Sequence, residues 1–213
     1  MSGLTNLEAI ANRIRQTLSA RDAAREGVIP RCREVIRQCG NAIRAVHRQE
    51  FAQAARLLKS ARALLAEVEP IASDEVGSAG LVRDAQKEFA EGSITLALVT
   101  GKHLPDPDEL GIDCVAYLNG LGEAVGELRR YLLDSMRRGD LSRGEELLSA
   151  MDDIYNVLVT MDFPDAITGG LRRTTDMVRG VLERTRSDLT LTMGQKELQD
   201  KLADFSKARR RKT

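Results

Sequence analysis

Apolar residues recur along this chain at intervals of three and four, the spacing that places side chains on one face of an α-helix. We find no stretch that alternates apolar and polar positions as a half-buried strand does. The pattern predicts an all-α fold, with a single domain of about seven helices over residues 1–205 and a disordered basic tail at 206–213. The predicted helices cover residues 5–46, 50–68, 80–100, 112–138, 142–159, 171–188 and 190–205.

Prolines and capping residues indicate where these helices end. Pro30 lies inside the first apolar row, so we expect a kink or break at residues 27–30. Pro70 is expected to end the second helix. The short connection at residues 101–111 favours an antiparallel arrangement of the two helices that it joins. Two capping boxes predict helix starts, Thr5 with Glu8 and Ser142 with Glu145.

Composition narrows the range of functions. The chain has 213 residues, and its 32 basic and 32 acidic side chains cancel, so a surface for nucleic acid would have to be locally basic. No apolar run is long enough to cross a membrane, and the N-terminus lacks the features of a secretory signal. We therefore expect a cytoplasmic protein without a membrane partner. The three cysteines are too few and too far apart for a zinc site.

Two of the predicted helices carry rows of carboxylates. Asp84, Glu88 and Glu91 fall within about 60° of one another on a helix with 100° per residue. Glu123 and Glu127 follow one another by one turn on the next long helix. Like charges at this spacing destabilise a helix slightly, so such rows need cations, either arginines or a metal. Ion pairs on a solvated face are the alternative interpretation.

A row of arginines lies on the first predicted helix. Its members, which fall within about 60° of one another, are Arg33, Arg37, Arg44 and Arg48. Over about four turns the row spans several phosphates of a nucleic-acid strand. It is equally compatible with a solubilising surface. His47 is expected to be a polar flank residue and His103 a loop residue, so neither is assigned as a general base.

Three glycines interrupt the predicted helix at 112–138. Gly120, Gly122 and Gly126 each cost up to about 1 kcal/mol relative to alanine in a helix. This cost indicates close approach of another helix or of a ligand backbone. Together with the long apolar rows, it predicts helix contacts between subunits of a homo-oligomer.

The run Ala116 to Arg130, AYLNGLGEAVGELRR, followed by DSMRRGD at residues 134–140, resembles the characteristic motif of the translin superfamily. The pairs Arg21-Asp22 and Arg25-Glu26 also fit that family. The resemblance extends from about Leu4 to Asp188. It implies a translin-type helical bundle that assembles into a closed shell, an octamer, around nucleic acid.

The acidic residues resemble those of the translin-associated factor X branch, here in a prokaryotic or archaeal form. Its Glu-x-x-Glu pair matches Glu88 and Glu91. Its Asp and the Glu four residues later match Glu123 and Glu127, with Glu123 one methylene longer than the aspartate. The resemblance implies an endoribonuclease for single-stranded RNA that binds Mg²⁺ or Mn²⁺ through Glu88, Glu91 and Glu123, with Glu127 as a further catalytic residue.

Two other functions fit the same residues. A non-catalytic protein could bind single-stranded RNA or DNA through the arginine row, as translin itself does in this family. A helical scaffold protein with solvated charged faces is the third possibility. Titration with a labelled oligonucleotide, with and without Mg²⁺, separates the three.

Overall fold

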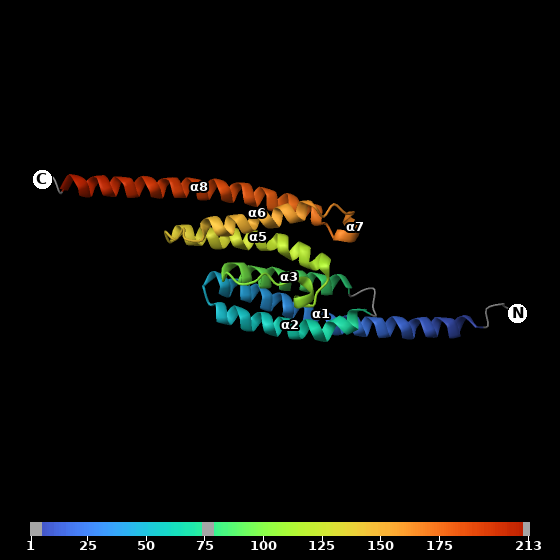
Figure 1. Cartoon of the computed structure of the whole chain (residues 1–213). Coiled ribbons are helices and arrows are strands. Elements are labelled where there is room, and N and C mark those ends of the chain that lie inside the picture. The colour runs from blue at the N-terminus through green and yellow to red at the C-terminus, as the bar shows by residue number, and fades with distance from the viewer. Residues whose placement is uncertain (1–5, 74–78, 211–213) are drawn as a thin grey trace.

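The computed structural model describes residues 6–73 and 79–210, and all regular structure within these ranges is helical (Figure 1). The all-α prediction is thus confirmed. The helices are α1 (Leu7–His47), α2 (Phe51–Ser73), α3 (Ala79–Val99), α4 (Pro107–Leu110), α5 (Cys114–Arg137), α6 (Gly144–Val159), α7 (Asp165–Thr168) and α8 (Leu171–Arg210). The short helices α4 and α7 lie in the connections between longer ones.

The long helices form two layers of three. Helices α1, α2 and α3 pack on one another, and so do α5, α6 and α8. The two layers meet mainly where α3 packs on α5 (Figure 1). Apolar side chains fill both layers and the seam between them, among them Val35, Leu65, Ile94, Leu128 and Met151, which are all buried. The α3–α5 seam therefore lies at the centre of the molecule.

Helices α3 and α5 run parallel, and the antiparallel arrangement that we expected is wrong. The backbone N–H of Asp113, before α5, donates to Gln86 early in α3. Farther along both helices, Gly120 of α5 lies against Ala90 of α3, and Glu123 lies close to Glu91. The connection from Thr100 to Asp113 can extend to about 45 Å, longer than the roughly 30 Å of α3. It can therefore return along α3 before α5 begins.

Gly120 allows α5 to approach α3 closely. A Cβ atom at this position would lie 2.6 Å from the Cβ of Ala90 and 2.6 Å from the carbonyl oxygen of Lys87. At Gly122 the neighbour is α8, where a Cβ would lie 2.4 Å from Thr174 Cγ2. Gly126 faces open space. Gly120 and Gly122 therefore serve contacts within one chain rather than the contacts between subunits that we expected.

Two expected helix boundaries, at Pro70 and Ser142, are wrong, and of the kink or break expected near Pro30 the break does not occur. Helix α1 continues through Pro30, because Val28 and Cys32 on either side are buried in one apolar row. Helix α2 continues through Pro70 to Ser73. Helix α6 begins at Gly144, since the Ser142 hydroxyl bonds Asp140 at 2.7 Å instead of capping the helix. Thr5 of the other expected capping box lies outside the described residues.

Helix α8 is continuous where we expected two helices. Leu189, at the expected break, is buried against Gly144 of α6, which holds this turn in place. The Thr190 hydroxyl donates to the carbonyl of Arg186 within the same helix. The helix ends at Arg210, so residues 206–210 of the expected disordered tail are helical. Residues 211–213 lie outside the described residues.

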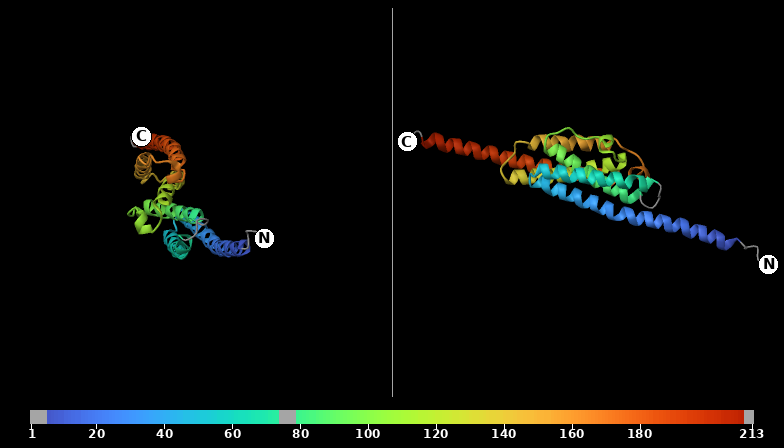
Figure 2. Two further views of the ribbon diagram at one scale, coloured as in Figure 1. Left: turned by 90° about the vertical axis from the view of Figure 1, so that its right-hand side faces the viewer. Right: turned by 90° about the horizontal axis from the view of Figure 1, so that it is seen from below.

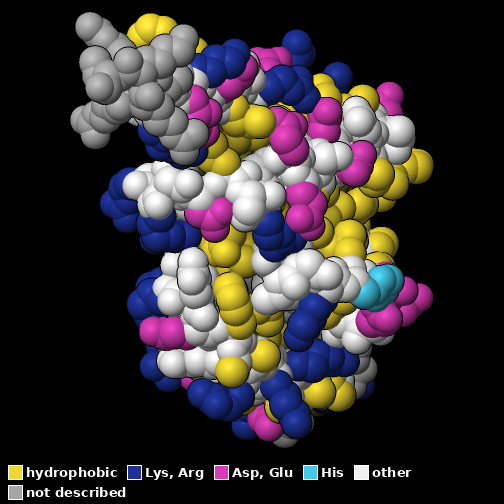
Figure 3. Space-filling view, turned by 60° about the vertical axis from the view of Figure 1, so that its left-hand side comes forward, with side chains coloured by type: hydrophobic (Ala, Val, Ile, Leu, Met, Phe, Trp, Pro, Cys, Tyr) yellow, Lys and Arg dark blue, Asp and Glu magenta, His cyan; other side chains and the backbone are white. Residues whose placement is uncertain are grey.

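The ends of α1 and α8 extend beyond the bundle in opposite directions (Figure 2). Both extensions carry exposed apolar residues at helical spacing, namely Leu7, Ile14 and Leu18 on α1 and Leu191, Leu198, Leu202 and Phe205 on α8. A groove of about 750 Å³ beside α5 and α6 is also apolar, with walls that include Leu104, Leu118, Val157 and Phe163. Figure 3 shows hydrophobic side chains reaching the surface between the layers. None of the helices over the described residues has the length and apolarity to span a bilayer.

Candidate metal centre

Three carboxylates meet at the seam between the two layers. Glu88 and Glu91 project from successive turns of α3, and Glu123 projects from α5. Each offers an oxygen atom, and the three atoms lie within 4.8 Å of one another. Gly120, one turn before Glu123, allows the close approach of the two helices that makes this cluster possible. We refer to Glu88, Glu91 and Glu123 as the acid cluster.

Burial disfavours charge on this cluster. Glu91 is only 9% exposed. Burial, followed by the charges of Glu88 and Glu123, raises the pKa of Glu91 to about 8. Burial also raises the pKa of Glu88, an effect that Lys87 partly offsets. A divalent ion favours several carboxylate oxygens and would neutralise their repulsion, so the donor set fits Mg²⁺ or Mn²⁺.

Lys87 already provides a cation at the edge of the cluster. Its ammonium lies 2.8 Å from Glu123 Oε1, and both side chains are partly buried. Burial lowers the pKa of Lys87, but the hydrogen bond to Glu123 and the nearby carboxylates outweigh it, so the pKa is raised. An ion bound through all three acids would compete with this pair for Glu123. We had not singled out Lys87 in the sequence, although it directly precedes Glu88.

Glu127 lies one turn beyond Glu123 but belongs to a different pair. Its Oε2 is 2.5 Å from Nε2 of His47, at the end of α1. This hydrogen bond lowers the pKa of Glu127, against the effect of burial. His47 is therefore no peripheral flank residue. The two positions are 80 residues apart, so no local pattern could have revealed the pair.

The His47 ring is well enclosed. Its side chain is 6% exposed, and its Nδ1 is buried without a hydrogen-bond partner among the described residues. Cys39, two turns earlier on α1, is fully buried near the acid cluster. Burial, then the charges of Glu88 and Glu91, raises the pKa of its thiol to about 12. Helix α1 thus closes one side of the acid cluster, and the Cys39 side chain there is a neutral thiol.

The arginine row lies on the outer face of α1. All four of its members, Arg33, Arg37, Arg44 and Arg48, are exposed. Three make short-range contacts: Arg37 pairs with Glu34, Arg44 donates to Asn41, and Arg48 pairs with Glu50. None of these contacts joins the arginine row to the acid cluster. Asp84, which extends the acidic row of α3, is exposed and lies outside the cluster.

Comparison with solved structures gives close matches to the whole fold. AfC3PO in a complex with duplex RNA is 32% identical, with a TM-score of 0.82, and the match covers 87% of this chain and 97% of that one. A second AfC3PO structure matches at 31% identity and a TM-score of 0.81 with the same coverage. The chain belongs to the translin superfamily. The resemblance of its sequence to that superfamily is thereby confirmed.

Two further matches are more distant. An uncharacterized protein of Methanocaldococcus jannaschii is 27% identical to this translin-superfamily chain over 194 residues, which is 87% of the chain and 83% of that protein. The structure of apo-NeC3PO, at 16% identity and a TM-score of 0.78, shares the fold and covers 90% of this chain and 100% of that one. No protein-family model matches the sequence.

Proposed function

We propose that this chain is a metal-dependent endoribonuclease of the translin-associated factor X branch, acting on RNA inside an oligomeric shell. The observation that carries the proposal is the acid cluster, in which Glu91 is buried with two further carboxylates within 4.8 Å. A carboxylate that is this enclosed among like charges needs a cation or a proton. The RNA in the AfC3PO complex supports a nucleic acid as the substrate.

Each acidic residue has a distinct role in this proposal. Glu88, Glu91 and Glu123 would hold Mg²⁺ or Mn²⁺. A bound ion would lower the pKa of a coordinated water and offset charge on the phosphate. Glu91 must lose its proton for this role, and Lys87 must release Glu123. Glu127, whose pKa is lowered by His47, is available as a carboxylate to accept a proton from the attacking water.

The arginine row would contact backbone phosphates. Arg33, Arg37, Arg44 and Arg48 present exposed guanidinium groups along one face of α1. Their present partners, Glu34, Asn41 and Glu50, are exposed or partly exposed, so exchange for phosphate oxygens costs little. These contacts would bind RNA without reading its sequence.

Removal of one carboxylate at a time tests the enzyme proposal. We expect Glu88→Gln, Glu91→Gln and Glu123→Gln each to lower the rate of Mg²⁺-dependent RNA cleavage at least about 100-fold, because each keeps the volume and removes a ligand charge. RNA affinity in EDTA should stay near that of the parent. Labelled single-stranded and duplex RNA are compared, since the AfC3PO complex holds a duplex. Glu183→Gln, on the exposed face of α8, is the control.

The second candidate is a binding protein without catalysis. It is favoured by two internal pairs, Lys87 with Glu123 and His47 with Glu127, which already partner two of the acids. Parent protein that binds RNA but never cleaves it with Mg²⁺ or Mn²⁺ would establish this alternative. Full activity of Glu88→Gln would also contradict the metal site proposed above.

A further inference from the structure

A polar cleft of about 440 Å³ opens directly beside the acid cluster. Helix α3, helix α5 and the start of α8 form its walls. Glu123 lines the cleft and also belongs to the acid cluster, so the two are continuous. Asn119 fixes the wall at α8, since its side chain donates to the carbonyl of Thr168 and accepts from the Thr174 hydroxyl.

Three cations line this cleft. Arg83 and Lys87 lie one turn apart on α3, and Arg173 faces them from α8. Arg83 approaches Asp113 only to 3.9 Å, and half of its side chain is exposed. Arg173 is exposed and makes no ion pair with any residue that the structure describes. Lys87 sits at the inner end, where it binds Glu123.

The cleft would have an excess of positive charge if Glu123 bound a divalent ion in the acid cluster. Asp84 also lines the cleft and is exposed. Glu123, if bound to a divalent ion, would no longer need Lys87, whose flexible stem could turn to another anion. Gly169 and Gly170 form part of the rim without side chains, which leaves the cleft open beside Arg173.

We propose that this cleft binds the sugar-phosphate backbone of the RNA strand next to the scissile bond, with Arg83 and Arg173 on its phosphates and Lys87 joining them when a divalent ion occupies the acid cluster. The inference rests on the proposed function. A phosphodiester strand fits because it must pass from the cluster into the adjoining cleft. The arginine row of α1 is a separate surface, with ion-pair partners Glu34 on α1 and Glu50 in the connection to α2.

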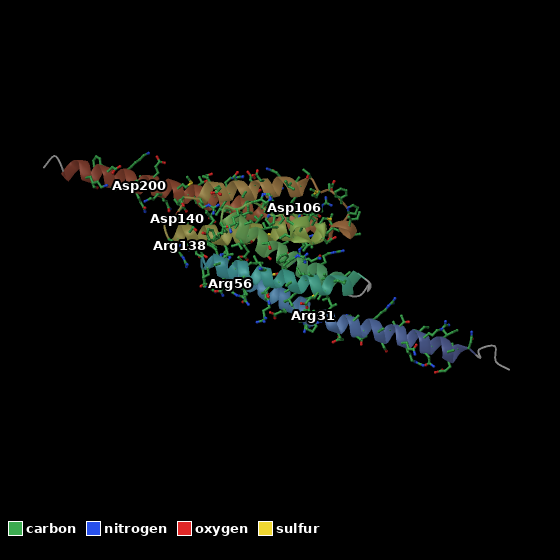
Figure 4. The ribbon with its side chains drawn as sticks, turned by 60° about the horizontal axis from the view of Figure 1, so that its bottom comes forward. Arg31, Arg56, Asp106, Arg138, Asp140 and Asp200 are labelled. Carbon is green, nitrogen blue, oxygen red and sulfur yellow. The ribbon has the colours of Figure 1, made fainter. Side chains whose placement is uncertain are left out.

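The test uses the full-length protein and a short fluorescein-labelled phosphorothioate oligoribonucleotide, which resists hydrolysis. In EDTA, the Arg83→Ala, Arg173→Ala double variant should bind it more weakly. Loss of two phosphate contacts should also reduce the slope of log affinity against log salt by about 1.4 for a single strand. Arg56→Ala removes an exposed arginine of α2 (Figure 4), a helix that contributes no residue to the cleft, and should change neither quantity.

Lys87→Met keeps the length of the side chain and removes its charge. We expect near-parental RNA affinity in EDTA, where Lys87 binds Glu123, and affinity weakened at least about threefold in Mg²⁺. A purely structural role would change both conditions equally and would overturn the part assigned to Lys87. Lys87→Arg should restore most of the Mg²⁺-dependent affinity.

The proposed role of the cleft is contradicted if the Arg83, Arg173 double variant keeps the parent's RNA affinity and salt dependence. So would an acidic peptide of equal charge that displaces the RNA as well as unlabelled RNA does. Failure of the enzyme proposal gives a different result. A parent protein that neither binds Mn²⁺ nor cleaves RNA would contradict the enzyme proposal, whereas weaker binding of RNA by the Arg83, Arg173 double variant in EDTA would still support the cleft.

Discussion

Glu91 couples folding to pH. Its pKa is raised from an ordinary value of 4.5 to about 8 in the folded chain, because burial and neighbouring carboxylates disfavour its charge. When the pKa of a group is higher in the folded chain than in the unfolded chain, the group stabilises the fold fully at pH values below its unfolded-state pKa. This stabilisation is lost as the pH rises through its folded-state pKa. For Glu91 the loss therefore occurs between about pH 4.5 and pH 8.

This gives a prediction for Glu91→Gln without metal. Glutamine cannot ionise, so the stability of the variant relative to the parent should rise with pH across this window, by up to about 1.4 kcal/mol per unit. Urea unfolding in EDTA at several pH values measures it, with Glu183→Gln as the reference. Added Mg²⁺ should restore the parent at pH 8. A difference that does not change with pH would show that Glu91 is not held protonated.

At the scale of helices, the contact of α3 with α5 decides whether the acid cluster exists. We expect Gly120→Ala to destabilise the protein by about 1 to 3 kcal/mol, because the added methyl would clash with Ala90 and the Lys87 carbonyl. The displaced α5 should also lose affinity for Mn²⁺. Urea unfolding and calorimetric titration with Mn²⁺ measure the two effects.

Gly126→Ala is the matched control in the same helix. Its added methyl meets open space, so we expect a gain of up to about 1 kcal/mol from helix propensity and unchanged Mn²⁺ affinity. Equal effects of the two substitutions would mean that helix propensity, rather than the α3–α5 contact, explains the result at Gly120.

The helices and the membership of the acid cluster could be predicted from the sequence, because helical periodicity is local and the family motif marks Glu88, Glu91 and Glu123. The direction of α5 could not, since a connection as long as residues 100–113 permits either arrangement. The partner of Glu127 could not either, because His47 reaches it from another helix. The sequence also left open whether the first helix breaks at Pro30; it continues because burial of the flanking apolar row outweighs one lost hydrogen bond.

At the scale of the whole molecule, the extensions of α1 and α8 leave apolar rows exposed at opposite ends. Rows of this kind on a water-exposed helix are typical of surfaces that other chains cover. We therefore predict a homo-oligomer, for which the family resemblance implies eight chains, by size-exclusion chromatography with light scattering. A species of 23.5 kDa at micromolar concentration would contradict this prediction.

A pair of substitutions locates the interface. Leu198→Glu with Leu202→Glu places charge on the apolar row of α8 and should yield smaller species, whereas Gln199→Glu adds a charge on the same helix at an exposed polar position and should not. An unchanged assembly in the leucine double variant would assign the interface to another surface, such as the apolar groove beside α6.

The seam between the layers also has a consequence for how the protein matures. The first layer is encoded entirely before residue 100 and the second entirely after residue 113, so each is built from local contacts that form early. A ribosome that has released only the first layer has released Glu88 and Glu91 without Glu123. If the acid cluster binds a divalent ion as proposed, the complete set of ligands exists only after the two halves have docked, and the bound ion would then stabilise the docked state.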